Sequence, residues 1–269
     1  MMRGLCAIWL ALVVLPVAAW AQTAAQDSAW NGYYFGVNVG GRFASNDWLT
    51  SLACPNVSIC NGGETGPDFK QSFDSTAVRV GAFGGRNWLL GSNWIAGVEA
   101  EVGWANNRNT NGPIPGATAS GGPTVTPSIT NGDTAAVNLR WDASLRARAG
   151  SLIRPDTLLY ATAGVALQQV ETVAACINDG TGTTFCTQPP GAWHYDSQTR
   201  WMPGWTIGAG LEHMLADRWL LRLEYRYADF GQANPTFFAN NIGDNGDDRI
   251  YAHVWVKTHT VSLGAAYKF

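Results

Sequence analysis

Hydrophobic and polar residues alternate with a period of two along much of this chain. In residues 137–150 every second position is Val, Leu, Trp or Ala, and the positions between them hold Asn, Arg, Asp, Ser and Gly. Successive side chains of a strand point to opposite faces, so this pattern predicts a strand with one apolar and one polar face. The alternation recurs at 33–40, 94–104, 219–227 and 260–269, and more weakly at 76–85, 157–169 and 201–212. The chain is therefore predicted to be all-β, with eight strands.

The charged residues of these strands share the polar phase. They are Arg79, Glu99, Glu101, Arg140, Asp142, Arg146, Arg148, Glu212, Arg222, Glu224, Arg226 and Lys268. The apolar phase carries Trp, Tyr, Leu, Val and Ala, with essentially no charge. This separation suits a soluble sandwich whose apolar face is buried, and equally a membrane barrel whose apolar face meets lipid.

Three further features favour the membrane barrel. Aromatic residues stand at strand ends, as in the girdles of outer-membrane barrels: Trp94 and Trp104, Trp201 and Trp205, Trp219 and Tyr227, Tyr267 and Phe269. Long connections at 44–75, 105–133, 171–198 and 231–250 alternate with short turns near 86–93, 153–156 and 214–218. Glycines crowd the polar phase, as a narrow lumen filled with side chains requires. We therefore predict an eight-stranded antiparallel transmembrane up-and-down β-barrel with four long external loops and its charges inside.

The first 21 residues have the pattern of an export signal. Arg3 is the only charge before an apolar run from Leu5 to Val17, and Ala19-Trp20-Ala21 supplies a small-x-small cleavage site. The run is shorter than the ~20 residues of a spanning helix. We expect a cleaved signal peptide at 1–21 and a barrel domain at 22–269.

Four cysteines remain after that cleavage: Cys54, Cys60, Cys176 and Cys186. An even number in an exported chain suggests two disulfides, although four cysteines allow three connectivities. The short separations favour the pairs 54–60 and 176–186. Zinc is the poorer interpretation, because these intervals are not the C-x₂₋₄-C kind.

Composition narrows the function classes. The net charge of −3 excludes a strongly basic nucleic-acid binder, and 46% hydrophobic residues give the chain far more apolar surface to bury than a disordered chain has. Only 14% of the residues are charged, against about 25% in average proteins. Much of the surface must therefore face something other than water.

Several segments resemble one family of Gram-negative outer-membrane proteins. Trp30-Asn-Gly-Tyr33-Tyr-Phe-Gly36 and Arg222-Leu-Glu224-Tyr-Arg226-Tyr-Ala-Asp229-Phe230-Gly231 are similar to signatures of the RopB-like small outer-membrane β-barrel proteins, as is the closing Val261-Ser-Leu-Gly264-Ala-Ala-Tyr267-Lys-Phe269. The resemblance implies the OmpA-transmembrane-like barrel often labelled "porin family", in the outer membrane among lipid and lipopolysaccharide. The ending with Tyr267 and Phe269 resembles the signal read by the barrel-assembly machinery, which implies that partner.

The number of strands bears on what such a barrel does. Eight strands leave an interior that side chains can fill, whereas larger porins hold an aqueous channel. Buried charges persist when they are paired, so we predict that arginine–carboxylate pairs, among them Glu99, Glu101, Arg140 and Arg146, plug the lumen. The leading hypothesis is a structural protein that supports the envelope and displays its loops, and the alternative is a small-solute or ion pore.

An outer-membrane hydrolase is a remote third possibility. The four histidines are His194, His213, His253 and His259. His213 adjoins a predicted periplasmic turn, and His253 could meet Asp247 or Asp248 near the outer rim, but no nucleophile motif accompanies it. Asp244, Asp247 and Asp248 lack the spacing of a calcium loop and suggest a solvated tip. We therefore assign no catalytic, cofactor-binding or metal-binding residues.

Overall fold

The computed structural model describes residues 30–56, 59–62, 70–109, 114–115, 134–177, 193–216, 218–239, 242–243, 246–247 and 249–269. The expected signal peptide and most of the predicted loop 105–133 lie outside these residues. In the described ranges no helix is long and apolar enough to cross a membrane.

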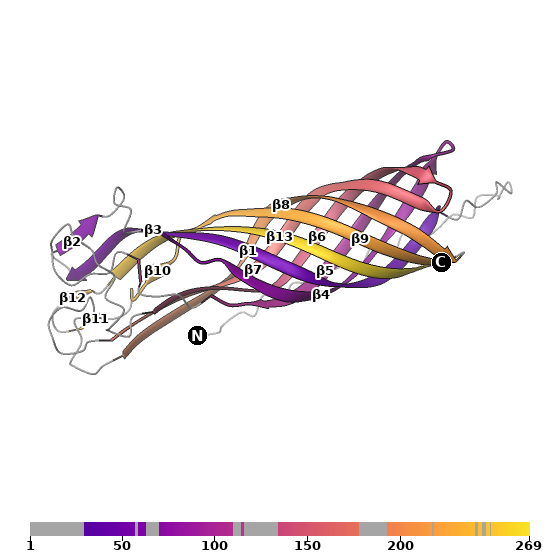
Figure 1. Ribbon diagram of the computed structural model, residues 1–269. Helices are drawn as coiled ribbons and strands as arrows, with labels where there is room; N and C mark the ends of the chain where they lie inside the picture. The colour runs from indigo at the N-terminus through magenta and orange to yellow at the C-terminus, as the bar shows by residue number, and fades with distance from the viewer. Residues whose placement is uncertain are drawn as a thin grey trace, which may run out of the picture.

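Eight long strands form one closed antiparallel sheet (Figure 1). They are β1 (Gly32–Asn56), β4 (Ser75–Leu90), β5 (Trp94–Asn107), β6 (Thr134–Arg154), β7 (Thr157–Ile177), β8 (Trp193–Ala216), β9 (Trp219–Ala233) and β13 (Arg249–Lys268). Each pairs with its neighbours along the chain, and β13 also pairs with β1 from Tyr34↔Lys268 to Cys54↔Arg249. This closure leaves no free edge along the ring and confirms the predicted eight-stranded barrel.

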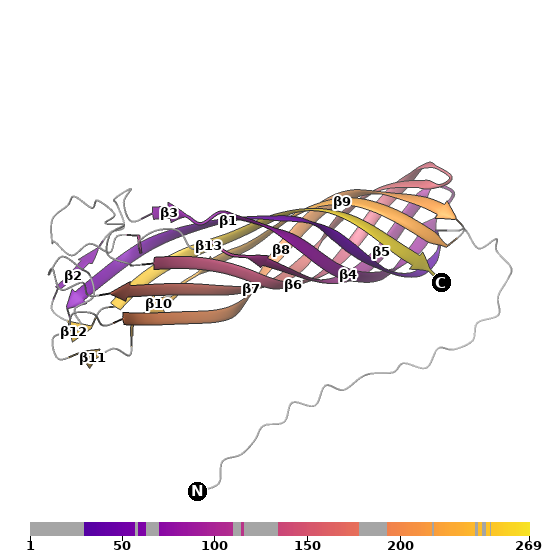
Figure 2. The same cartoon turned by 60° about the horizontal axis from the view of Figure 1, so that its bottom comes forward.

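The two ends of the barrel differ. The short connections β4–β5, β6–β7 and β8–β9 lie at one end, here called the turn end, with the chain's C-terminus. The opposite loop end carries the short strands β2 (Ile59–Gly62), β3 (Lys70–Ser72), β10 (Thr236–Phe237), β11 (Ile242–Gly243) and β12 (Gly246–Asp247). In Figure 2 the long strands continue well toward the loop end.

Several strands are longer than the sequence pattern predicted. β1 has 25 residues and β8 has 24, whereas about 9–11 residues cross a bilayer. The predicted loops 44–75 and 171–198 are therefore partly strand. The predicted turn 86–93 shrinks to residues 91–93 because β4 runs to Leu90.

A reversal of polarity explains why those extensions were missed. Near the turn end of β13 the outward side chains are apolar, and Leu263 is 63% exposed. Nearer the loop end, Lys257 and His253 face outward, while Val254 and Val256 are fully buried inside. The period of two continues, but the apolar phase moves from the outer face to the inner face. The outer apolar band of β13 thus covers only part of the strand. Beyond it, apolar side chains lie inside the barrel and polar ones outside, as in a soluble protein.

A β-bulge corrects the predicted phase of β6. The β5–β6 register shifts between Trp104 and Asn107, and the β6–β7 register shifts between Leu139 and Asp142. A bulge adds one residue and changes which side chains face inward. Leu139 is consequently buried inside, and Arg140 points outward, contrary to our prediction for both.

The barrel interior consists of an ionic layer between two apolar layers. The turn-side apolar layer consists of Trp30, Tyr34, Phe83, Ile95, Leu158, Tyr160, Leu220 and Ala266. Trp30 lies just before β1, and its indole nitrogen donates to the carbonyl of Pro155 over 2.9 Å. This side chain therefore reaches across the turn end of the barrel.

The loop-side apolar layer is larger. Its bulkiest members include Trp48, Phe73, Ile114, Val137, Leu139, Val170, Met202, Phe230, Phe237, Phe238, Ile250, Val254 and Val256. Trp48 stacks on Phe237 with ring centres 5.2 Å apart, and lies 5.7 Å from Phe73. The interior on the loop side of the ionic layer is thus a packed apolar core, which our sequence analysis did not predict.

Candidate functional site

Eleven buried charged side chains meet in the middle of the barrel. This ionic cluster contains Arg42, Arg79, Arg146, Arg148, Arg222, Arg226, Glu99, Glu101, Asp142, Glu212 and Glu224. They come from six strands, because the inward positions of β1, β4, β5, β6, β8 and β9 reach the same level of the barrel. Six arginines face five carboxylates, so the cluster carries one positive charge in excess.

Arg146 of β6 lies at the centre of the cluster. One of its terminal nitrogens is 2.5 Å from Glu99 and 2.7 Å from Glu101, and the other is 2.5 Å from Glu224. Its side chain is fully buried. A single guanidinium therefore neutralises carboxylates from two strands, β5 and β9.

The turn-side half of the cluster packs on aromatic rings. Arg222 is 2.6 Å from Glu99 and 2.5 Å from Glu212. Its guanidinium carbon lies 4.0 Å from the centre of the Phe83 ring, and that of Arg148 lies 4.1 Å from the Tyr160 ring. Such cation–π contacts strengthen when water is excluded. The ionic and turn-side apolar layers are therefore joined by direct contacts.

Tyrosine hydroxyls add hydrogen bonds to two of the five carboxylates. Tyr34 donates to Glu99 over 2.7 Å, and Tyr160 donates to Glu224 over 2.8 Å. Arg148 in turn donates to the Tyr34 hydroxyl over 2.8 Å. Buried charges are tolerated when their remaining hydrogen-bonding groups are satisfied in this way.

The loop-side half is organised by Asp142. Arg79 binds both oxygens of this carboxylate, at 2.6 and 2.9 Å, and also approaches Glu101 at 2.7 Å. Arg226 reaches Glu101 at 2.8 Å and Asp142 at 3.1 Å. Gly103 makes room for this arrangement, because a Cβ there would collide with the Arg79 guanidinium.

Arg42 is the cluster member that our sequence analysis missed. It lies in the inward phase of β1, but the predicted strand ended at Gly40. Continuing the alternation past the Gly40-Gly41 pair would have found it. Arg42 is 3.0 Å from Asp142 and donates to the carbonyls of Ala105, Leu139 and Arg140. These carbonyls flank the register shifts of β5 and β6, so Arg42 supplies the hydrogen bonds that the bulged ladder lacks.

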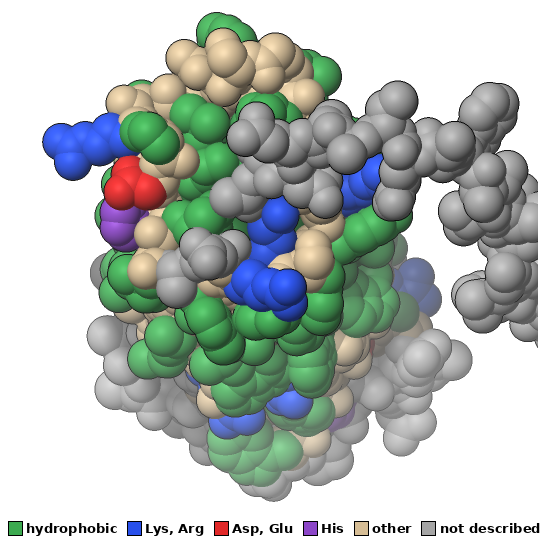
Figure 3. Space-filling model, turned by 90° about the vertical axis from the view of Figure 1, so that its right-hand side faces the viewer, with side chains coloured by type: hydrophobic (Ala, Val, Ile, Leu, Met, Phe, Trp, Pro, Cys, Tyr) green, Lys and Arg blue, Asp and Glu red, His purple; other side chains and the backbone are tan. Residues whose placement is uncertain are grey.

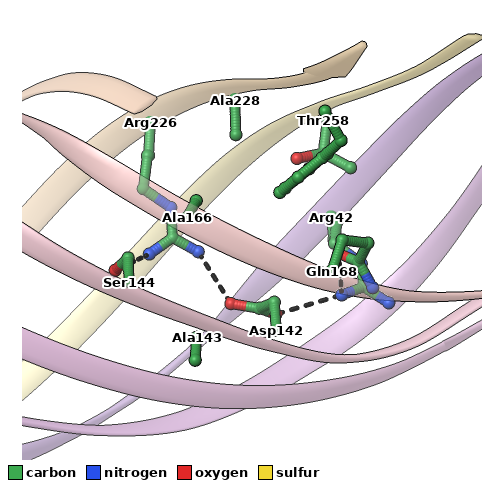
Figure 4. Close-up of a pocket in the computed structure, with 10 residues that line it drawn as sticks. Arg42, Asp142, Ala143, Ser144, Ala166, Gln168, Arg226, Ala228 and Thr258 are labelled. Carbon is green, nitrogen blue, oxygen red and sulfur yellow. Dashed lines mark hydrogen bonds and ion pairs between the residues drawn. The ribbon is translucent and has the colours of Figure 1, made fainter. Parts of the chain in front are cut away.

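A small cavity lies between part of the ionic cluster and the loop-side apolar layer (Figure 4). Arg42, Asp142 and Arg226 line it on the charged side, and Ala228 and Phe230 belong to the apolar layer. Its volume is about 10 Å³, which is close to the least that holds one water molecule.

Ten of the twelve charged residues predicted for the lumen belong to the cluster. Arg140 does not: its side chain is 44% exposed on the outer face and lies 3.4 Å from Glu171. Lys268 is half-buried at the end of β13, on the turn side of the cluster. The bulge explains the error at Arg140, whereas Lys268 stands opposite the inward-facing Tyr34 and keeps the predicted inward phase beyond the cluster.

The structure describes only some of the cysteines, aromatic residues and histidines that our sequence analysis singled out. Cys176 is fully buried and disulfide-bonded, whereas Cys186 and the side chains of Cys54 and Cys60 lie outside the described residues. The predicted pairing therefore stays a prediction. Tyr267 and Phe269 stack edge to face at the turn end, with ring centres 5.4 Å apart. His253 contacts Gln232 and Asn234 at 2.6 and 2.7 Å.

A closed antiparallel ring with an apolar outer band and an ionic interior defines a transmembrane barrel of the outer-membrane class. The comparisons with known proteins agree. Residues 7–269 match the family model described as "Outer membrane protein beta-barrel domain", and the chain belongs to this family.

The chain is also similar to named outer-membrane proteins and to a solved structure. It is 29% identical to the 31 kDa outer-membrane immunogenic protein of Brucella melitensis, over 78% of this chain and 80% of that protein. It is 28% identical to the 22 kDa outer membrane protein of Rhizobium leguminosarum, over 70% of this chain and 64% of that protein. The crystal structure of OprG from Pseudomonas aeruginosa shares the fold, with a TM-score of 0.51 at 12% identity, over 89% and 97% of the two chains. The protein is an outer-membrane protein of a Gram-negative bacterium.

Proposed function

We propose that this protein is a structural component of the outer membrane, with a closed lumen and with its loop end displayed to the exterior. The observation that carries this proposal is the ionic cluster, which joins six strands across the middle of the barrel. Packed apolar layers lie on both sides of it. A continuous water-filled path would have to break ion pairs that hold the strands together.

The orientation follows from the connections. Outer-membrane barrels carry short turns on the periplasmic side and longer loops outside. The turn end of this barrel would then face the periplasm, and the part beyond the apolar band would stand above the outer leaflet. The Brucella relative is named an immunogenic protein, which supports a surface exposed to the exterior.

We infer no catalytic role. His253, the histidine that sequence analysis singled out, contacts two amides, Gln232 and Asn234, within the described residues. A general base needs a partner that orients it and a nucleophile or water within hydrogen-bond reach. The amide contacts suit a polar interface residue instead.

Planar-bilayer recording tests the closed lumen. The purified protein is expected to give no steady current, with heat-modifiable gel migration of the same vesicles proving that folded barrels are present. Arg146→Gly, which removes the central guanidinium, should raise the frequency of brief openings, whereas Arg140→Gly on the outer face should not. A steady open-channel current from the unaltered protein would refute the proposal and favour a small-solute pore.

A further inference from the structure

Arg86 lies outside the lumen, on the lipid-facing side of β4 near the turn end. Its guanidinium carbon lies 4.9 Å from the centre of the Tyr33 ring and 5.3 Å from that of the Trp88 ring. One terminal nitrogen also donates to the Tyr33 hydroxyl over 3.2 Å. Tyr33 stands directly opposite Arg86 on β1. The two rings therefore hold an exposed guanidinium in one place on the outer surface.

A second arginine–tyrosine pair lies further around the same end. Arg218 donates to the Tyr267 hydroxyl over 3.2 Å, and the Tyr267 ring packs edge to face on Trp219. β1 pairs with β4 and β13, and β13 pairs with β9, so the two pairs lie on neighbouring strands. We call Arg86, Tyr33, Tyr267 and Arg218 the turn-end strip. Figure 3 views this end, where Lys and Arg side chains lie among hydrophobic ones.

Arg86 differs from the arginines of the lumen in its electrostatic surroundings. The arginines of the lumen form ion pairs with buried carboxylates, and Arg140–Glu171 and Lys70–Asp47 are ion pairs nearer the loop end. Among the described residues, no ion pair includes Arg86. A guanidinium at a membrane surface that no protein carboxylate neutralises attracts the anionic headgroups of lipids.

The side chains of the turn-end strip suit a lipid phosphate group. The planar guanidinium binds phosphate oxygens through two parallel hydrogen bonds. Tyrosine and tryptophan rings at the membrane–water interface lie at the level of the lipid headgroups. Tyr33 and Trp88 are both exposed on the outer face, where they could contact the glycerol and upper acyl chain of a lipid whose phosphate meets Arg86.

We propose that Arg86 is the centre of a binding site for the phosphodiester headgroup of an anionic phospholipid of the periplasmic leaflet, with Tyr33 and Trp88 as its walls. This inference rests on the proposed orientation, which places the turn end in that leaflet. The positive charge of the Arg86 guanidinium favours lipids with net negative charge over zwitterionic ones.

The test measures lipid retained by the full barrel in native mass spectrometry, with phosphatidylglycerol, phosphatidylcholine or lipopolysaccharide titrated into the detergent. The unaltered protein should retain phosphatidylglycerol in preference to phosphatidylcholine. Arg86→Gln should weaken phosphatidylglycerol binding about fivefold, the factor for one basic side chain at an anionic surface. Arg154→Gln is the matched control: Arg154 is also exposed at the turn end, but no aromatic ring contact holds it among the described residues. Its lipid retention should match that of the unaltered protein.

Three outcomes would overturn the inference. They are an unchanged affinity of Arg86→Gln, an equal loss in Arg154→Gln, and equal retention of the two phospholipids. A preference for lipopolysaccharide over phosphatidylglycerol that depends on Arg86 would contradict the choice of a phospholipid as the ligand. The conductance experiment is independent of all these results, so the failure of the closed-lumen proposal would be distinguished from the failure of this one.

Discussion

Two arginines on β6 offer a direct test of the energetic role of the ionic cluster. Our sequence analysis placed Arg140 and Arg146 in the same lumen, whereas the structure puts Arg146 inside and Arg140 outside. Arg146→Met removes the charge and keeps most of the apolar stem. It leaves Glu99, Glu101 and Glu224 without a guanidinium that lies 2.5 to 2.7 Å from each of them.

The size of the effect follows from burial. Removing one partner from a buried ion pair costs about 3–5 kcal/mol, because the other charge is left uncompensated. Arg222 and Arg226 still contact Glu99 and Glu101, which keeps the expected loss within that range. Arg140→Met breaks a half-exposed pair with a separation of 3.4 Å, and such surface pairs contribute roughly 0–1 kcal/mol.

The assay is reversible urea unfolding of the barrel in phospholipid vesicles, followed by tryptophan fluorescence and by heat-modifiable gel migration. A double variant, Arg146→Met with Glu224→Gln, should lose less than the sum of the two single losses, by about 0.5–3 kcal/mol. Equal losses for Arg140→Met and Arg146→Met would refute the assignment of inside and outside. Strict additivity in the double variant would show that the contact between Arg146 and Glu224 carries no coupling.

Three further changes test other parts of the fold with the same unfolding assay. Arg42→Met should destabilise the barrel by about 3 kcal/mol, since it leaves buried backbone carbonyls without a donor and removes one of the arginines that contact Asp142. A loss below about 1 kcal/mol would mean that the bulged ladder does not need this side chain. Tyr160→Phe removes the hydroxyl bonded to Glu224 and should cost about 1.5–3 kcal/mol, as for hydrogen bonds to charged groups; no change would show that the carboxylate finds another donor. Leu263→Arg, in the middle of the outer apolar band of β13, should cost about 2–4 kcal/mol, whereas His253→Arg on the same face beyond the band should change stability by less than about 0.5 kcal/mol; similar losses at the two positions would contradict the polarity reversal.

The sequence predicted the number of strands and most of the ionic cluster, because both depend on local alternation. Glu99 and Glu101 on β5, and Arg222, Glu224 and Arg226 on β9, keep one uninterrupted phase and lie where that phase puts them. The inward position of these residues follows from alternation along a single strand, without knowledge of its neighbours.

The errors arose where a strand depends on its neighbours. The outward turn of Arg140 follows from a bulge that β6 shares with β5 and β7, and one extra residue is invisible to a pattern counted along a single strand. The alternation of β13 continues through Val254 and Val256, but its apolar phase there faces a protein core instead of lipid. A search for one lipid-facing apolar phase stops where the outer face passes from lipid to water. The predicted strand therefore ends too early.

The bulge and the cluster depend on each other. The shift at Leu139 and Arg140 frees carbonyls inside the barrel, and Arg42 binds them while it also contacts Asp142. Without the bulge, Arg140 would point into the lumen and Leu139 would leave the loop-side apolar layer. The cluster would then carry seven arginines against five carboxylates, a second uncompensated positive charge in a space that excludes water. The register shift therefore sets the charge balance of the plug as well as the level at which the interior changes from ionic to apolar.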